Sequence, residues 1–220
     1  MTTRFTKRTG GVSHGAFASL NLGGHVGDNP DDVARNREIA AGPFGEVQYM
    51  NQVHGDRIAI IEQVSDEEPT ADALVTGIPG IALAVMVADC IPLLLKSEEA
   101  VAAVHVGRRG LVNEITRKTL SVMRDMGATQ ITAIIGPAIC GTCYEVSQEL
   151  HDEVTAVHPF AKSLTKIGTP ALDLPAALRS VLSDEGVPLL NKFVCTLESD
   201  EYFSYRRDGI TGRQAGIISL

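Results

Sequence analysis

The 220-residue sequence has no tryptophan, and aromatic residues make up only 5% of it. It also has no apolar run approaching the roughly 20 residues that a bilayer-spanning helix needs. The first residues, MTTRFTKRTGG, lack the apolar core of a signal peptide. These absences predict a soluble, cytoplasmic protein with no membrane partner.

Basic residues and cysteines are also scarce. The chain has 19 lysine and arginine residues against 27 acidic ones, a net charge of -8. Proteins that bind nucleic acid usually present a basic surface, so no nucleic-acid partner is expected. Four cysteines in a chain of this length do not indicate the disulfide framework of a small secreted protein. They are interpreted as buried thiols, with one of them a candidate metal ligand.

The remaining composition is ordinary for a globular protein, at 44% hydrophobic and 21% charged residues. Because no repeat or long linker interrupts the chain, a single domain over residues 1–220 is predicted. Helices are expected over 30–41, 111–126, after Ser147, and from Asp173 to Gly186. Strands are expected over 57–62, 81–87, 92–96, 101–106, 131–136, 191–197 and 214–220. Since several strands follow one another directly, an α+β fold with mixed sheets is predicted.

Three polar residues stand at the ends of apolar segments, beside glycine or proline. Cys90 follows Asp89 between AVMVA and IPLLL, His105 lies in VAAVHVG, and His54 lies in NQVHG. Two imidazoles and one thiolate are the ligand set of an open zinc site. The spacings of 36 and 15 residues match no local zinc motif. The chemistry of the three residues therefore permits a shared metal, but their spacing does not require one.

A Cys-x-x-Cys pair, Cys140 and Cys143, occurs in the segment CGTC. This spacing is found in redox dithiols and in halves of structural zinc sites. Because no second pair follows, the preferred interpretation is a tight loop with packed thiols that are dispensable for activity. Tyr144 and Glu145, the next residues, are better candidates for ligand contact.

The segment ESDEYFSYRRDGITGRQAG near the C-terminus is dense in arginine and aromatic residues. Such residues suit a planar, anionic ligand such as a base with a phosphate, which makes Arg206 and Arg207 candidate binding residues. The alternative is a solvated hairpin with cation–π packing.

Seven motifs, in order, closely resemble the YfiH-type family, whose members are also described as polyphenol oxidase or laccase-domain (DUF152-like) proteins. They are GVSHGAFASLNLGGHVGDNPDDVARNRE, NQVHG, DALVT, ADCIPLLL, AAVHVGRRG, IGPAICGTCYEV and FSYRRDGITGRQAGII. The resemblance implies a sandwich of mixed β-sheets flanked by helices, not a cupredoxin fold. It also implies a zinc or copper site held by His54, Cys90 and His105.

The same resemblance implies a purine nucleoside phosphorylase that uses phosphate to cleave adenosine, inosine and S-methyl-5′-thioadenosine, with adenosine deaminase activity in addition. Zinc is the expected metal and copper the alternative, and a monomer or weak homo-oligomer is expected. The catalytic residues expected are Cys90, His105, Asp89 and Glu145, the last two as candidate proton shuttles. The substrate-binding residues expected are Arg108, Arg109, Arg206, Arg207 and Tyr144.

One position departs from the family pattern. Where the family reads His-x-Gly-Trp-Arg-Gly, this chain has Arg108 in place of the tryptophan. A guanidinium still stacks on a planar base but adds charge and hydrogen-bond donors, so substrate preference is the property most affected.

Three other functions remain open from the sequence. Copper at the same residues would suit phenol oxidation, although the six histidines include no His-x-His pair of the kind found in multicopper sites. Cys90 and His105 would also suit a metal-free thiol hydrolase, as nucleophile and base. The last alternative is a non-enzymatic binding module with a structural metal.

Overall fold

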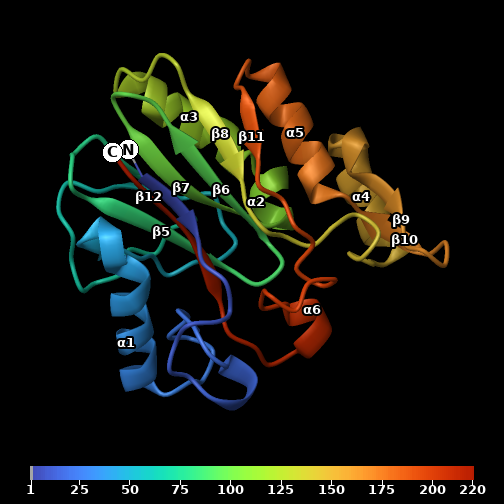
Figure 1. The fold of residues 1–220 in the computed structure, drawn as a ribbon. Coiled ribbons are helices and arrows are strands. Elements are labelled where there is room, and N and C mark those ends of the chain that lie inside the picture. The colour runs from blue at the N-terminus through green and yellow to red at the C-terminus, as the bar shows by residue number, and fades with distance from the viewer. Residues whose placement is uncertain (1) are drawn as a thin grey trace.

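Two β-sheets packed face to face, with helices on both outer sides, make up the computed structural model of residues 2–220 (Figure 1). The larger sheet has the strand order β11 (Leu189–Asn191), β8 (Thr132–Ile135), β6 (Ile91–Lys96), β7 (Val101–Val106), β4 (Ala73–Thr76) and β3 (Ile58–Ile60). The smaller sheet has the order β1 (Thr2–Phe5), β12 (Gln214–Ser219), β5 (Ala82–Val87) and β2 (Val47–Gln48). A separate hairpin pairs β9 (Lys162–Leu164) with β10 (Pro170–Leu172).

Both sheets are mixed, as the sequence predicted. Strands β6 and β7 pair antiparallel, whereas β8 with β11, β3 with β4, and β2 with β5 run parallel. The central strands β5 and β7 are buried along their whole length. Strands covered on both faces need apolar side chains on both, which explains their continuous apolar sequences.

The core therefore lies in three layers. Between the sheets, β5, β4, β6 and β12 contribute Leu83, Val85, Leu74, Leu94 and Ile218. The outer face of the larger sheet packs on helices through residues such as Leu120, Val154 and Leu178. The outer face of the smaller sheet packs on α1 and the loops around it, with Leu22 and Ile217 at the contact.

The helix boundaries follow recognisable capping residues. Helix α1 (Pro30–Ala41) begins at Asn29, whose side chain accepts from the backbone N–H of Asp31. Ser147 caps α4 (Gln148–Val157) and Asp173 caps α5 (Leu174–Asp184) in the same way. These helices lie where the sequence predicted them.

The remaining helices are α2 (Arg108–Val112), α3 (Ile115–Asp125), α6 (Tyr205–Asp208) and the short 3₁₀ turns η1 (Gly15–Phe17), η2 (Gly42–Phe44) and η3 (Pro159–Ala161).

Two predicted elements differ from the structure. The continuous helix predicted over 111–126 is divided into α2 and α3, because Glu114 adopts a left-handed conformation with a φ of 60°. The strand predicted over 191–197 is wrong, since β11 ends at Asn191 and the chain leaves the sheet edge there. The segment that follows carries Cys195, whose backbone forms an isolated bridge with Ala138.

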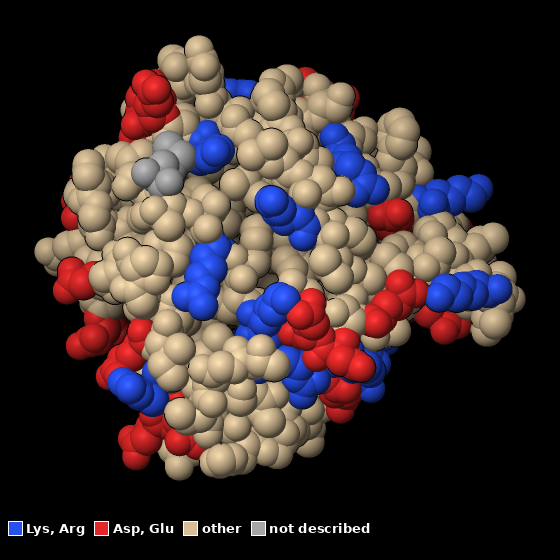
Figure 2. All heavy atoms as spheres, viewed as in Figure 1, with Lys and Arg blue, Asp and Glu red and all other residues tan. Residues whose placement is uncertain are grey.

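Surface charge is mixed on the face shown in Figure 2, where lysine and arginine side chains are scattered among acidic ones. Within residues 2–220, none of the helices has both the length and the apolar character of a membrane span.

Candidate metal centre and adjoining cleft

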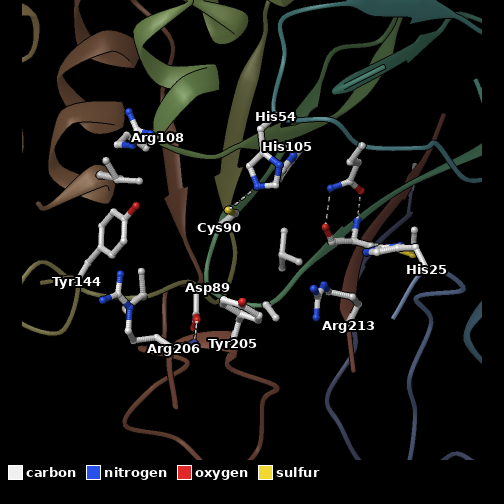
Figure 3. Close-up of a pocket in the computed structure, with 16 residues that line it drawn as sticks. His25, His54, Asp89, Cys90, His105, Arg108, Tyr144, Tyr205, Arg206 and Arg213 are labelled. Atoms are coloured by element: carbon white, nitrogen blue, oxygen red, sulfur yellow. Dashed lines mark hydrogen bonds between the residues drawn. The ribbon is translucent and has the colours of Figure 1, made fainter. Parts of the chain in front are cut away.

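Three segments distant in sequence bring His54, Cys90 and His105 together. His54 lies in the loop before β3, Cys90 in the turn between β5 and β6, and His105 on β7. Their ligand atoms all lie within 4.8 Å of one another. The Nε2 atom of His54 is 3.8 Å from the Cys90 sulfur, and the two imidazole centroids are 4.6 Å apart (Figure 3). The trio that the sequence suggested is thus a physical cluster.

The orientation of both imidazoles depends on Asp72, a fully buried residue just before β4. Its Oδ1 atom lies 2.8 Å from Nδ1 of His105 and accepts from the backbone N–H of His54 at 2.9 Å. Its Oδ2 atom accepts from the backbone N–H of Gly55 at 2.6 Å and of Val53 at 3.3 Å. Because Nδ1 of His105 is engaged, its Nε2 atom is left for the cluster.

Burial, hydrogen bonds and neighbouring charges shift the pKa values of Cys90, His105 and Asp72. Burial opposes ionisation of Cys90, but the imidazoles of His105 and His54 lower the pKa of this thiol to about 6. Burial by itself would lower the pKa of His105, yet the Cys90 thiolate and the Asp72 carboxylate raise it to about 9. The Asp72 carboxyl has a lowered pKa because its bonds to His105 and to backbone N–H groups outweigh its burial.

This donor set fits a divalent metal. A thiolate and two imidazoles are ligands that zinc and copper accept, and three protein ligands leave a coordination position for substrate. Gly107 permits the close approach of the three segments, because a Cβ atom there would lie 3.1 Å from the His54 ring and 3.2 Å from the Cys90 sulfur. A side chain at this position would require the His54 ring and the Cys90 sulfur to shift by a few tenths of an ångström.

A cleft of about 380 Å³ adjoins the cluster. That volume suits a small-molecule ligand. The walls carry apolar side chains together with three arginines and two tyrosines (Figure 3). The labelled residues that line the cleft are His25, His54, Asp89, Cys90, His105, Arg108, Tyr144, Tyr205, Arg206 and Arg213.

The arginines give the cleft an anion-binding character. The guanidinium of Arg206 lies 5.2 Å from the centroid of the Tyr144 ring. Arg108 and Arg206 lie on the Tyr144 side of the cluster, and Arg213 lies on the other side, near His25 (Figure 3). None of the three arginines forms an ion pair within residues 2–220. Unpaired guanidinium groups in a cleft are suited to an anionic ligand.

Asp89 lines the cleft, but both of its carboxylate oxygens are engaged. Oδ1 accepts from the Thr196 hydroxyl at 2.6 Å, and Oδ2 accepts from the backbone N–H of Arg206 at 2.7 Å. The residue has a φ of 91°, a left-handed conformation that these contacts hold in place. Asp89 therefore anchors the start of α6 and the arginine on it.

Three residues expected at the site lie elsewhere. Glu145 is exposed and absent from the cleft, because successive residues of an extended segment point to opposite sides and Tyr144 takes the inward one. Arg109 is exposed on the outer side of α2. Arg207 points away from the cleft, pairing with Asp208 and donating to the carbonyls of Thr196 and Tyr202.

Sequence reasoning also missed residues that the structure places in or behind the cleft. Asp72 was not selected, although an aspartate opening the apolar segment DALVT is a polar residue at a strand end like the others. Arg213 belongs to the same arginine-rich segment, but the adjacent pair Arg206 and Arg207 is the more prominent feature of that segment. Gln52, which pairs with the backbone of Met86 at 2.7 and 2.8 Å, had no distinguishing signal.

Comparisons with known proteins agree over the whole chain. The sequence model of a family described as multi-copper polyphenol oxidoreductase laccase matches residues 2–220. A purine nucleoside phosphorylase of Streptomyces coelicolor is 46% identical over 98% of this chain and 94% of its own length. The purine nucleoside phosphorylase YfiH of Shigella flexneri is 38% identical over 97% of this chain and 91% of its own.

Solved structures give the same result. A DUF152 protein of Neisseria meningitidis has a TM-score of 0.91 and 40% identity, covering 99% of this chain and 93% of its own. The YfiH protein of Bacillus licheniformis has a TM-score of 0.89 and 30% identity, covering 100% and 92%. The chain therefore belongs to the YfiH (DUF152) family, the one whose sequence model is described as multi-copper polyphenol oxidoreductase laccase.

Proposed function

We propose that this protein is a metal-dependent purine nucleoside phosphorylase. Its substrates are adenosine, inosine and S-methyl-5′-thioadenosine, and adenosine deamination is a second activity of the same site. The observation that carries the proposal is the His54–Cys90–His105 cluster beside an arginine-lined cleft. The Streptomyces coelicolor relative, 46% identical over 98% of this chain, bears the name purine nucleoside phosphorylase, which supports this assignment.

Phosphorolysis places three demands on the site. Phosphate must be held against the anomeric carbon, positive charge developing on the sugar must be tolerated, and the departing purine must be stabilised. Arg206 and Arg108 supply charge-assisted donors for phosphate on the Tyr144 side of the cleft. The rings of Tyr144 and Tyr205 and the apolar side chains of the walls suit the nucleoside.

His54, Cys90 and His105 would hold zinc, with copper as the alternative. A divalent ion at this position would act as a Lewis acid on the reacting part of the nucleoside. Asp72 keeps His105 in the tautomer that presents Nε2 to the cluster. Asp89 keeps Arg206 at the cleft by binding its backbone N–H, a positioning role in place of the proton shuttle expected from the sequence.

The proposal is tested with protein freed of metal and reloaded with zinc or copper. Inosine with inorganic phosphate should give hypoxanthine and ribose 1-phosphate in equal amounts, and omitting phosphate should abolish base release. Cys90→Ala should lose both the metal at this site and turnover, because two imidazoles alone do not complete the ligand set. His14→Ala removes an exposed histidine outside the cleft and is the matched control.

Other outcomes would favour the alternatives. Phenol oxidation by the copper-loaded protein without nucleoside turnover would favour the oxidase, although the His54–Cys90–His105 cluster contains only two histidines. Loss of turnover in Cys90→Ala with the metal retained would favour Cys90 as a nucleophile. No turnover of any nucleoside, with or without metal, would contradict the proposal.

A further inference from the structure

A second group of metal-ligand residues lies outside the cluster described above. Cys140 and Cys143 come from the turn after β8, and Cys195 and Glu198 come from the segment after β11. One ligand atom from each of the four lies within 4.8 Å of the others. We propose that these residues bind a structural zinc ion, with three thiolates and one carboxylate as its four ligands.

The geometry suits a tetrahedral site. Zinc–sulfur bonds of about 2.3 Å place tetrahedral donors about 3.8 Å apart, so the observed spacing needs only a small contraction. The backbone N–H groups of Cys143 and Tyr144 both donate to the Cys140 carbonyl at 3.1 Å, which forms a tight turn. That turn lets the two thiols of the Cys-x-x-Cys pair face the same point. Four protein ligands leave no open position, which is typical of structural rather than catalytic zinc.

Polar groups contact two of the three sulfur atoms. The Cys195 sulfur accepts from the backbone N–H of Cys140 at 3.4 Å, and the Cys140 sulfur lies 3.3 Å from the Thr142 hydroxyl. Hydrogen bonds to ligand atoms from neighbouring groups commonly orient and stabilise metal ligands. Lys166 donates to Glu198 at 2.7 Å. Its charge offsets part of the excess negative charge that three thiolates and a carboxylate leave on a zinc site.

The four residues connect a segment that lines the cleft to a second segment that contacts the cleft residue Asp89 from behind. Ala138 and Cys195 form a backbone bridge, and Thr196, next to Cys195, donates to Asp89. Tyr144, next to Cys143, lines the cleft. A zinc ion here would hold this wall in place without touching the substrate. A disulfide within the group would instead leave the third thiol and the carboxylate without a shared partner.

The test counts metal rather than turnover, so it is independent of the proposed function. Protein purified without added metal and then saturated with zinc should contain two zinc ions per chain after desalting. Cys90→Ser should contain one, and the double variant Cys140→Ser/Cys143→Ser should also contain one. The double variant should melt at a lower temperature, because it no longer binds the zinc ion, which stabilises only the folded state. Its turnover of inosine should stay within several-fold of the parent.

Cobalt substitution identifies the ligands. Because one site has three thiolates and the other has one, the sulfur-to-cobalt charge-transfer band of Cys90→Ser should be about three times that of the double variant. Glu198→Gln should weaken zinc binding at this site while leaving the Cys90 site unchanged.

Three results would overturn the proposal. The first is one zinc ion per parent chain and none in Cys90→Ser. The second is an unreduced intact mass lighter by two hydrogen atoms, which would show a disulfide among the three cysteines. The third is unchanged zinc content in the double variant. If the double variant fails to fold, the zinc content of Cys90→Ser decides alone, since that variant retains all four ligands of the second site.

Discussion

At the scale of single residues, the organisation of the metal cluster depends on a side chain that is not itself among the proposed ligands. Asp72 receives three consecutive backbone N–H groups, from Val53 to Gly55, and contacts the ring of His105. The three N–H bonds hold His54 in a left-handed conformation with a φ of 59°. One buried carboxylate thus positions both imidazoles.

Asp72→Asn should weaken metal binding at this cluster. An amide has one acceptor oxygen where the carboxylate has two, so its NH₂ group must face a backbone N–H or the His105 ring. Loss of such an outer contact typically lowers metal affinity by about 10–100-fold. Zinc affinity measured by chelator competition checks this. The control is Asp56→Asn. Asp56 is an exposed carboxylate in the loop that carries His54, and it pairs with Lys118 of α3, so this variant should leave the zinc affinity unchanged.

Arg108 stands where the family resemblance implies a tryptophan, and its side chain lines the cleft. Arg108→Trp should shift the ratio of kcat/KM for inosine over adenosine toward adenosine. A guanidinium donates to the O6 acceptor of inosine but meets an amino donor on adenosine, and an unpaired buried polar group costs about 1–3 kcal/mol. Steady-state kinetics with both nucleosides give the ratio. Arg109→Trp, on an exposed neighbour, is the control, and an unchanged ratio in Arg108→Trp would contradict the assigned role.

At the scale of elements, the site is assembled from turns and strand ends while the strands themselves form the core. Cys90 follows β5, and the Cys140–Tyr144 turn follows β8. The start of α5 packs against that turn, because a Cβ atom on Gly141 would meet the Asp173 side chain at 2.6 Å. Gly141 is therefore required for the close approach of the turn and the helix.

Asp173→Ala should destabilise the protein through α5. The Asp173 carboxylate accepts from the backbone N–H of Ala176 at 2.7 Å, and losing such a cap costs about 1 kcal/mol. For a protein of this size that corresponds to a melting temperature lower by about 2–4 °C. Thermal unfolding with zinc held constant measures the change. Asp173→Asn keeps an acceptor and should lie close to the parent, so an equal loss in both variants would argue against capping as the cause.

At the scale of the whole molecule, the two sheets are held together by the aliphatic layer between them. Leu94, on β6, is fully buried in this layer and packs near Gly216 of β12. With no tryptophan in the chain, aliphatic contacts of this kind provide most of the packing between the sheets.

Leu94→Ala should lower the free energy of unfolding by about 2–5 kcal/mol, because it removes buried methyl groups and leaves a cavity. Leu164→Ala, at a leucine that is 56% exposed, should change it by no more than about 0.5 kcal/mol. Denaturant unfolding followed by circular dichroism compares the two. Similar values for both variants would mean that the inter-sheet layer repacks.

Much of the local structure follows from sequence signals that act over a few residues. The caps Asn29, Ser147 and Asp173 act on groups within a few residues of themselves, so the starts of three helices could be predicted. The central strands could also be predicted from their long apolar segments, because burial on both faces of a sheet requires apolar side chains throughout. The ordered motifs also identified the family, and with it the trio of candidate ligands.

Which polar residues come into contact depends on the tertiary structure. The Asp72 carboxylate contacts the ring of His105, which is 33 positions away on the adjacent strand. The sulfur of Cys195 accepts a hydrogen bond from the backbone N–H of Cys140, which is 55 positions away. No periodicity or local spacing encodes such contacts, because they depend on strand order and on how turns project from the sheets. Side-chain direction explains the remaining differences. Tyr144 and Glu145 are neighbours in an extended segment. Arg206 and Arg207 are neighbours in a short helix. In each pair, backbone geometry directs the first residue into the cleft and the second away from it.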